Sequence, residues 1–191
     1  FLFYKVGPSP GSWWGMVRTS TNGGKKWTSP EKLPDEILGP IKNKSVQLAN
    51  GTILSPSSTE TKEANWKAHI EKSTDLGKTW QLIPVDPKTE FSVIQPCILI
   101  HPGSKLQILC RSRNNVILQA YSEDNGNTWS EFSRTSLPNP NSGIDAVTLN
   151  NGWHLLVYNP TTQGRNGRAK LNVAISEDGI NWLDAVILEN E

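Results

Sequence analysis

The chain of 191 residues carries 19 Lys and Arg against 18 Asp and Glu, which gives a formal net charge of +1. A charge this close to zero gives no electrostatic reason to expect nucleic acid or an anionic membrane as a partner, and no apolar run approaches the ~20 residues of a membrane span. The 15 Gly and 13 Pro separate many short β-rich runs, and the 3.6-residue period of an amphipathic helix is absent. This pattern predicts an all-β protein.

The β-rich runs follow one another along the chain in four groups. Each of the last three groups contains four runs, whereas the first contains three, so we expect about fifteen strands. In chain order the runs lie at 1–6, 13–20 and 26–33; at 45–50, 52–58, 65–73 and 79–85; at 92–100, 105–113, 115–122 and 128–135; and at 144–150, 152–159, 169–176 and 181–188.

A recurring turn separates the last two runs of every group. Its copies follow the loose pattern Ser-x-Asp-x-Gly-x-Thr-Trp and read STNGGKKW (20–27), STDLGKTW (73–80), SEDNGNTW (122–129) and SEDGINW (176–182). The Asp or Asn can accept bonds from nearby backbone N–H groups, the Gly supplies a positive φ, and the Trp covers apolar surface. Four copies with a period of about 50 residues predict a repeat architecture.

This turn resembles the Asp box, the signature of sialidases and their relatives, which are six-bladed β-propellers. The resemblance implies four-stranded antiparallel blades, here at about 1–38, 39–88, 89–137 and 138–191. Blade one has no run for its inner strand, and leaving that strand out would expose backbone groups. We therefore expect about four blades that are a piece of a six-bladed sialidase-like propeller; a self-contained four-bladed ring is the alternative.

Antiparallel strands place the connections of a blade on two opposite faces. All the Asp boxes lie on one face, named here the box face. The opposite face, named the loop face, is rich in Lys, Arg, Asn, Gln and carboxylates, and it collects the segments 39–45, 55–66, 89–96, 110–115, 137–145 and 158–168. Loops on one face of a rigid scaffold commonly carry sites. This face suits a polyhydroxylated ligand with a carboxylate, because the planar Arg fork can hold a carboxylate by two bonds.

Two arginines are similar to those with which sialidases grip the sugar carboxylate. Arg111 stands in CRSR ahead of VILQAYSEDNGNTW, and Arg168 stands in GRAKLNVAISEDGINW. The runs GPIKNKS, SSTE, SLPNPNSGIDAVTL and LLVYNPT resemble bacterial sialidase-like proteins of the BNR-repeat type. The third arginine of the family would precede residue 1. An ordinary structural ion pair for Arg111, or a solvent-facing Arg168, is the alternative.

The resemblance also implies a catalytic set, which this sequence matches in part. Sialidases use a tyrosine nucleophile with a glutamate partner and an aspartate acid/base; the tyrosine would follow residue 191 and the aspartate would precede residue 1. Gln95 stands at the position of the glutamate, and a neutral amide cannot accept the tyrosine proton as a carboxylate does. Glu60 and Asp145 are candidate substitutes. The segment alone is therefore expected to be inactive.

Further polar residues of the loop face are candidates for substrate binding. Lys42 and Lys44 flank Asn43 at the entrance to an inner strand, and strand alternation predicts that both lysines lie on one side. Asn159 lies in the connection that also carries Arg168. Neither a metal nor another cofactor is expected, because metal-ligand spacing is absent from the three histidines, His69, His101 and His154.

The two cysteines bear on the pairing register of the runs at 92–100 and 105–113. In one register Cys97 faces Cys110; after a slip of one residue Gln95 faces Arg111 and the cysteines are offset. We prefer the second register, since it places Gln95 beside Arg111. Free, buried thiols are then expected.

Together these features predict a sialidase-like glycosidase that acts on a terminal acidic sugar held by arginines on the loop face. Two alternatives stay open. One is a non-catalytic carbohydrate-binding propeller, which Gln95 favours; the other is a lyase or hydrolase acting on uronic-acid polysaccharides. The expected partner is in each case an acidic carbohydrate, a sialic acid or uronic acid glycan. The family resemblance implies a secreted or periplasmic protein.

Overall fold

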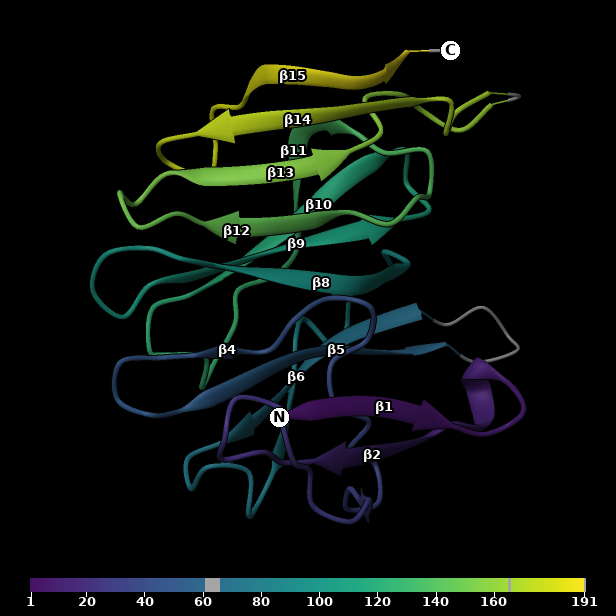
Figure 1. The fold of residues 1–191 in the computed structure, drawn as a ribbon. Coiled ribbons are helices and arrows are strands. Elements are labelled where there is room, and N and C mark those ends of the chain that lie inside the picture. Colours follow the sequence, from purple (N-terminus) through teal and green to yellow (C-terminus); the bar gives the residue numbers. More distant parts are fainter. Residues whose placement is uncertain (61–65, 165, 191) are drawn as a thin grey trace.

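The structure is a computed structural model that describes residues 1–60, 66–164 and 166–190. Those residues form fifteen strands and one turn of 3-10 helix, η1 (Pro10–Ser12). The strands make four antiparallel sheets that follow one another along the chain, one with three strands and three with four (Figure 1). The predicted all-β architecture of stacked, propeller-type blades is thereby confirmed.

Each sheet is built from strands that are consecutive in sequence. The first sheet contains β1 (Leu2–Val6), β2 (Trp14–Arg18) and β3 (Glu31–Lys32). The second contains β4 (Val46–Gln47), β5 (Ile53–Glu60), β6 (Trp66–Ser73) and β7 (Gln81–Pro84). The third contains β8 (Val93–Ile100), β9 (Leu106–Ser112), β10 (Val116–Ser122) and β11 (Ser133–Pro138). The fourth contains β12 (Asp145–Thr148), β13 (His154–Tyr158), β14 (Lys170–Ser176) and β15 (Leu183–Asn190). The division of the chain into blades at about residues 38, 88 and 137 stays a prediction.

Two of the outer strands begin later than the sequence predicts. β7 and β15 start directly after the tryptophan that ends their Asp box, but β3 and β11 do not. The segment between Trp129 and β11 has other contacts, since the Phe132 N–H donates to Asp86 at 2.9 Å and the Phe132 ring is buried in the core. These tertiary contacts override the strand propensity of that run.

The Asp boxes form the predicted turns. In the second box the Asp75 carboxylate accepts bonds from the Thr79 N–H at 2.9 Å and from the Thr79 hydroxyl at 2.6 Å. In the first box Asn22 accepts the Lys26 N–H at 2.9 Å. Each box contains a glycine with a positive φ, namely Gly24, Gly77, Gly126 and Gly179, and in the first box Gly23 has one as well. The boxes therefore close hairpins, and their polar groups are used within the turn.

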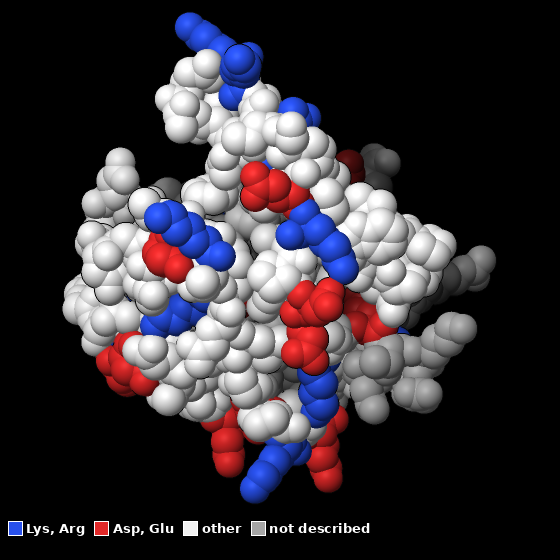
Figure 2. All heavy atoms as spheres, turned by 90° about the horizontal axis from the view of Figure 1, so that it is seen from below, with Lys and Arg blue, Asp and Glu red and all other residues white. Residues whose placement is uncertain are grey.

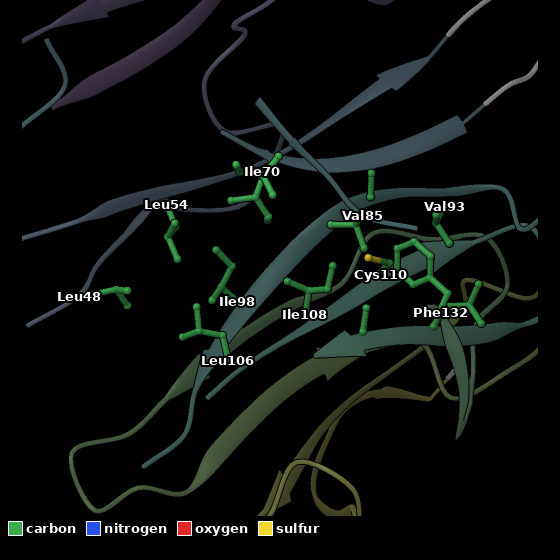
Figure 3. Packing of buried hydrophobic residues seen from close by; sticks show 14 residues of the cluster. Leu48, Leu54, Ile70, Val85, Val93, Ile98, Leu106, Ile108, Cys110 and Phe132 are labelled. Atoms are coloured by element: carbon green, nitrogen blue, oxygen red, sulfur yellow. The ribbon is translucent and has the colours of Figure 1, made fainter. Parts of the chain in front are cut away.

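Apolar side chains fill the spaces between neighbouring sheets. Residues of the second and third sheets, among them Ile70 and Ile108, meet in one cluster (Figure 3). A second cluster, which includes Leu109 and Leu156, joins the third and fourth sheets. Fully burying a side chain of this kind contributes roughly 1.5–3 kcal/mol. This packing holds the three larger sheets together, so their loops keep fixed relative positions.

The pairing of β8 with β9 decides where Gln95 and the cysteines lie. Cys97 pairs with Leu109, so the predicted offset of the cysteines is confirmed, and both thiols are free and buried. The prediction that Gln95 pairs with Arg111 is wrong. A register shift interrupts the ladder between Ile94 and Cys97, and Ile94 pairs with Arg111 instead. A bulge of this kind adds a residue to one strand, which changes the direction of its side chains.

The connections lie on two faces, as the antiparallel topology requires. In Figure 1 the end of β5 and the β9–β10 connection of the loop face lie toward the right, and the β14–β15 box turn lies at the left. Figure 2 shows acidic and basic side chains intermixed on the end of the molecule formed by the first sheet. Within the described ranges, no helix has the length and apolar character needed to cross a membrane.

Candidate functional site

Two arginines from neighbouring sheets meet on the loop face. Arg111 lies near the end of β9, and Arg168 lies just before β14. The Arg111 Nε–H donates to the Asn141 side-chain oxygen at 2.9 Å, and an Arg168 Nη2–H donates to the Asn141 main-chain carbonyl. One residue of the segment that enters β12 therefore orients both guanidinium groups.

Asn141 takes this position in a left-handed backbone conformation. Its φ is +56°, a region that Asn tolerates better than most residues. The turn is closed by its neighbours, since the Asn139 amide donates to the Ser142 carbonyl at 3.1 Å and the Ser142 N–H donates to Asn139 Oδ1 at 3.2 Å. The turn-forming sequence around Asn141 was visible, but nothing in it indicated which side chain would reach the arginines.

Gln95 reaches Arg111 from the bulge in β8. Its side-chain oxygen accepts a bond from Arg111 Nη1 at 3.3 Å, and its N–H donates to Ser58 Oγ at 3.3 Å. Pro96, which follows, has no N–H to offer the ladder, and Gln95 itself has a φ of +55°. Backbone strain of this kind costs about 1–3 kcal/mol and is concentrated at functional sites. A neutral acceptor thus lies next to Arg111 without cancelling its charge.

The two guanidinium groups are close enough to influence each other. The pKa of Arg111 is lowered, first by burial and then by the positive charge of Arg168, while the Glu60 carboxylate acts in the opposite sense. The ion pairs formed by the described residues involve Lys or His as the cation. Neither arginine is therefore paired with a carboxylate within these ranges, so both charges are available to an anionic ligand.

Trp66, the first residue of β6, lies beneath the arginines of β9 and its loop. The Arg113 Cζ atom lies 3.8 Å from the Trp66 ring centroid, and the Arg111 Cζ atom lies 5.2 Å from it. Trp66 is buried, and a cation–π contact is worth ~0.5–2 kcal/mol. The sequence did not reveal this role, because the contact joins two blades and has no local pattern.

The segment ahead of β4 reaches across to the fourth sheet. Lys42 Nζ donates to the Ile144 carbonyl at 2.6 Å, and Lys44 Nζ forms an ion pair with Asp145 at 2.7 Å. Both lysines therefore extend toward the start of β12. The strand alternation predicted from the sequence does not explain why both lysines point the same way, because β4 begins only at Val46 and Lys42 has a φ of +65°.

Asn43, between these lysines, is buried and supports the bulge in β8. Its amide donates to the Gln95 and Pro96 carbonyls, both at 2.9 Å. Two carbonyl groups that the bulge removes from the β8–β9 ladder are satisfied in this way. Asn43 thereby helps to hold Gln95 beside Arg111.

The two candidate carboxylates have different surroundings. Asp145, the first residue of β12, is engaged by Lys44. Glu60, the last residue of β5, pairs with Trp66 across the β5–β6 ladder and is close enough to Arg111 to affect its pKa. No hydrogen bond or ion pair of the Glu60 carboxylate is formed within the described part of the chain. Of the two carboxylates, only that of Glu60 has no bonding partner among the described residues.

Asn159 is buried at the end of the connection from β13. Its amide donates to the Arg168 and Lys170 carbonyls. It therefore shapes the loop that carries Arg168, and direct contact of Asn159 with a ligand stays a prediction.

A cavity of about 160 Å³ lies between the inner strands, next to the ion pair of Lys44 and Asp145, and Cys97 is part of its lining. Burial, followed by the charge of Asp145, raises the pKa of Cys97 to about 12, so the thiol is protonated and unreactive near neutral pH. Across the described residues, no group of three or more His, Cys, Asp or Glu side chains is placed to hold a metal ion.

Comparison with solved structures places this fold among sialidases. The sialidase Hz136, described as Hadza microbial, has a TM-score of 0.75 at 20% identity, over 94% of this chain and 38% of that one. The Ruminococcus gnavus intramolecular trans-sialidase has a TM-score of 0.70 at 20% identity, over 93% and 41%. The NanB sialidase of Streptococcus pneumoniae has a TM-score of 0.67 at 17% identity, over 93% and 29%. The present chain thus spans well under half of each structure, and identities this low establish the fold alone.

Sequence comparison gives the family. No curated protein is significantly similar to the chain, but the BNR repeat-like domain family matches residues 1–191 in full. The match agrees with the Asp boxes and with the sialidase-type sheets. The chain belongs to the BNR repeat-like domain family and has the fold of the sialidase β-propellers.

Proposed function

We propose that the loop face binds the carboxylate of a terminal acidic sugar, and that the chain supplies this binding face to a sialidase-like glycosidase. The observation that carries the proposal is the convergence of Arg111 and Arg168 on Asn141, with no carboxylate partner for either among the described residues. A carboxylate bound between two oriented forks makes charge-assisted bonds, which are about twice as strong as neutral ones.

The structural relatives support an acidic sugar as the ligand. The R. gnavus trans-sialidase was solved in complex with oseltamivir carboxylate, and a leech intramolecular trans-sialidase in complex with 2,7-anhydro-Neu5Ac. We assign further polar contacts with hydroxyl groups to Gln95, which is bonded to Arg111, and to Lys42 and Lys44, which extend toward the start of β12. Asn43 and Asn159 would support the site without contacting the ligand. Asn43 bonds to the bulge in β8, and Asn159 bonds to the loop that carries Arg168.

In a hydrolytic reaction Glu60 is the carboxylate best placed for proton transfer, because its oxygens are uncommitted within the described residues. Asp145 would first have to leave its ion pair with Lys44, so we assign it a positioning role. Gln95 would orient the sugar through its bond to Arg111 and would not transfer a proton.

A non-catalytic carbohydrate-binding propeller is the second candidate, and Gln95 is the observation that favours it. A neutral amide stands beside Arg111 where the sialidase resemblance implies a glutamate. Binding is common to both candidates, whereas turnover separates them.

Binding is tested by calorimetric titration of the chain with N-acetylneuraminic acid, glucuronic acid and the methyl ester of each. We expect the acids to bind and the esters to bind much more weakly. Arg111→Ala should weaken acid binding by about 10- to 100-fold, the value of a hydrogen-bonded charge. Arg111→Lys should restore only part of the loss, because an ammonium group cannot form the planar fork.

Arg18→Ala is the matched control, since Arg18 ends β2 toward the box face, and it should bind acids as the unmodified chain does. Equal affinity of acids and esters, or an Arg111→Ala variant that binds as well as the unmodified chain, would refute the proposal. Release of a fluorophore from an aryl sialoside by the whole protein that contains this chain then distinguishes hydrolysis from binding alone.

A further inference from the structure

We propose that the contact between the third and fourth sheets is an acid-sensitive joint, in which protonation of a histidine pair loosens the fourth sheet. The inference goes beyond the proposed function, because the joint needs no ligand to open. The pair lies at the box-face end of the two sheets, where His101, in the β8–β9 turn, meets His154, the first residue of β13. The centroids of the two imidazole rings are 4.6 Å apart, and the ring planes cross at 62°.

The repeat shows which side chains occupy the same place in the neighbouring contact. The first two strands of the second, third and fourth sheets form equivalent hairpins, and the pairs that close them are Gln47 with Ile53, Ile100 with Leu106, and Thr148 with His154. Counted from these pairs, Leu48, Leu54 and Leu106 between the second and third sheets correspond to His101, Gln107 and His154 between the third and fourth. The three leucines belong to one apolar cluster, so one contact is apolar and the next is polar.

An Asp-box glycine packs on the equivalent residue in both contacts. A Cβ at Gly126 would lie 3.1 Å from a Leu54 methyl carbon, and a Cβ at Gly179 would lie 2.2 Å from Gln107 Oε1 and 3.0 Å from His101 Cε1. The same backbone arrangement therefore accepts leucines in one contact and polar side chains in the other. Because burying polar groups is costly unless they are hydrogen-bonded, packing alone does not account for the histidines.

Gln107 determines which ring nitrogen of His101 carries a proton. The Gln107 amide N–H₂ donates to the Gly179 carbonyl at 2.8 Å and to the Gln119 side-chain oxygen at 2.9 Å. The Gln107 oxygen is therefore an acceptor, and it lies 2.9 Å from His101 Nε2. His101 thus donates from Nε2, and the fourth Asp box is connected to the third sheet through this one amide.

His154 is held in its neutral form. The side chain is 1% exposed, and its Nδ1 lies 3.0 Å from the Thr148 hydroxyl. Burial, followed by His101, lowers the pKa of His154 to about 4, while the charge of Asp178 acts in the opposite sense. The Asp178 carboxylate already accepts backbone N–H groups of its own turn. A proton on His154 is therefore unfavourable while the contact is closed.

Among the described residues, the other titratable groups around the pair are engaged elsewhere or exposed. Tyr121, on β10, donates to the Gln119 side chain at 3.1 Å, and burial raises its pKa. Lys105 lies 5.0 Å from the centroid of the Tyr121 ring and 3.5 Å from the Glu123 carboxylate. Glu177, next to Asp178 in the fourth box, is exposed. A positive charge on the pair consequently lacks a buried counter-ion in this part of the chain.

The direction of the effect follows from linkage. A histidine released into water has a pKa of ~6.5, above that of His154 in the closed contact, so the open state binds more protons. The contact is fully stabilised above pH ~6.5 and loses this stability as the pH falls through about 4. The third sheet carries Arg111 and the fourth leads in from Arg168, so opening separates the two guanidinium groups. Only this last consequence rests on the proposed function.

Hydrogen exchange of the chain at pH 7 and pH 5 tests the joint. After correction for intrinsic exchange rates, the protection of β13 and β14 should fall about tenfold at pH 5 relative to that of β10. A triple variant with His101→Leu, Gln107→Leu and His154→Leu copies the contact between the second and third sheets and should show no such loss. His69→Leu is the matched control, because His69 is buried beside Glu71 in the second sheet, and it should keep the loss.

A second readout uses the unmodified chain and so does not depend on the folding of any variant. The His154 ring resonance should titrate with a midpoint well below ~6.5. Protection of the fourth sheet that is equal at both pH values, a loss that persists in the triple variant, or a His154 midpoint near 6.5 would each overturn the joint.

Titration with N-acetylneuraminic acid at the same two pH values separates the joint from the proposed function. Weaker binding at pH 5, restored in the triple variant, would connect the joint to the arginines. If affinity is unchanged while the fourth sheet loses protection, the joint stands and its coupling to the arginines is refuted. If the acid binds at neither pH while the loss of protection remains, the proposed function fails and the joint stands.

Discussion

Arg111 and Arg168 belong to different sheets, yet both donate to Asn141, one to its side-chain oxygen at 2.9 Å and the other to its main-chain carbonyl. Because one residue holds both groups, a displacement of Asn141 moves both guanidinium groups together. The hydrogen bonds also hold two like charges in proximity, which is unfavourable unless an anion binds. Under the proposed function, the two guanidinium groups are therefore oriented before a ligand binds.

The role of Asn141 is tested by Asn141→Gly. Glycine permits the φ of +56° and keeps the main-chain carbonyl, so only the bond to Arg111 is lost. We expect acidic-sugar affinity to fall by about three- to tenfold, roughly the value of one hydrogen bond, with little change in the free energy of unfolding. Calorimetry and urea unfolding measure the two quantities.

Asn125→Gly serves as the control, since Asn125 has a similar φ of +58° in the third Asp box and should leave sugar affinity unchanged. A companion variant, Asn141→Asp, should weaken binding further than Asn141→Gly, because its carboxylate would compete with the ligand for Arg111. Undiminished affinity in both Asn141 variants would show that the arginines are oriented by other contacts.

Glu71 is expected to be a main determinant of stability between the first two sheets. Its fully buried carboxylate accepts the Leu38 N–H at 2.7 Å and the Gly39 N–H at 2.6 Å, and it lies 3.3 Å from the His69 ring nitrogen. In Glu71→Gln an amide N–H₂ faces a backbone donor. We expect the free energy of unfolding in urea to fall by about 2–4 kcal/mol. One buried backbone N–H, of Leu38 or Gly39, would lose its acceptor, and the other would lose its bond to a charged group.

Glu123→Gln is the matched surface change, because Glu123 is 70% exposed and lies 3.5 Å from Lys105. Exposed pairs contribute little, so this variant should stay within about 0.5 kcal/mol of the unmodified chain. If both glutamine variants were equally stable, the buried carboxylate would have no special role in joining the sheets.

The second Asp box should make stability depend on pH in the acid range. Hydrogen bonds from the Thr79 hydroxyl and N–H lower the pKa of Asp75 to about 2. Because the pKa is lower in the folded chain, the carboxylate stabilises the fold at pH above its unfolded pKa of ~3.9. That contribution is lost as the pH falls through about 2.

Asp75→Asn removes this contribution, so the variant should be less stable than the unmodified chain at pH 7, and the difference should shrink between about pH 4 and pH 2. Thermal unfolding followed by circular dichroism across that range measures it. Glu131→Gln, an exposed carboxylate outside the turn, should show no such dependence. A difference between Asp75→Asn and the unmodified chain that stays constant with pH would mean that the charge of Asp75 is unimportant for the turn.

The repeat made most of the architecture predictable from the sequence. Each Asp box carries its own hydrogen-bond partners, as with Asp75 and Thr79, so the turn forms from local chemistry and marks the end of a strand. Strand order within a blade then follows from short connections, and the two faces follow from antiparallel pairing. For the same reason Arg111 and Arg168 could be assigned to the loop face, although their roles there stay predictions.

The parts that could not be predicted depend on contacts between blades. The late start of β11 results from Phe132 packing in the core, and the bulge at Gln95 results from a proline within a ladder that Asn43 completes from another sheet. Asn43 lies far along the chain from Gln95, and Asp86, which accepts the Phe132 N–H, lies far from Phe132. Because of the bulge, Ile94 pairs with Arg111 in the ladder, and Gln95 contacts Arg111 only through its side-chain oxygen.

The sequence by itself determined the all-β class, the four Asp-box hairpins and the face on which the two arginines lie, because each depends on turn chemistry and on antiparallel strand order. Only the tertiary structure decided that Asn141 joins the arginines, that Trp66 lies beneath them, and that the rings of His101 and His154 meet between the third and fourth sheets. These relationships arise when separate sheets pack together, and their geometry is set by side-chain volumes and bulges whose effects no local pattern records.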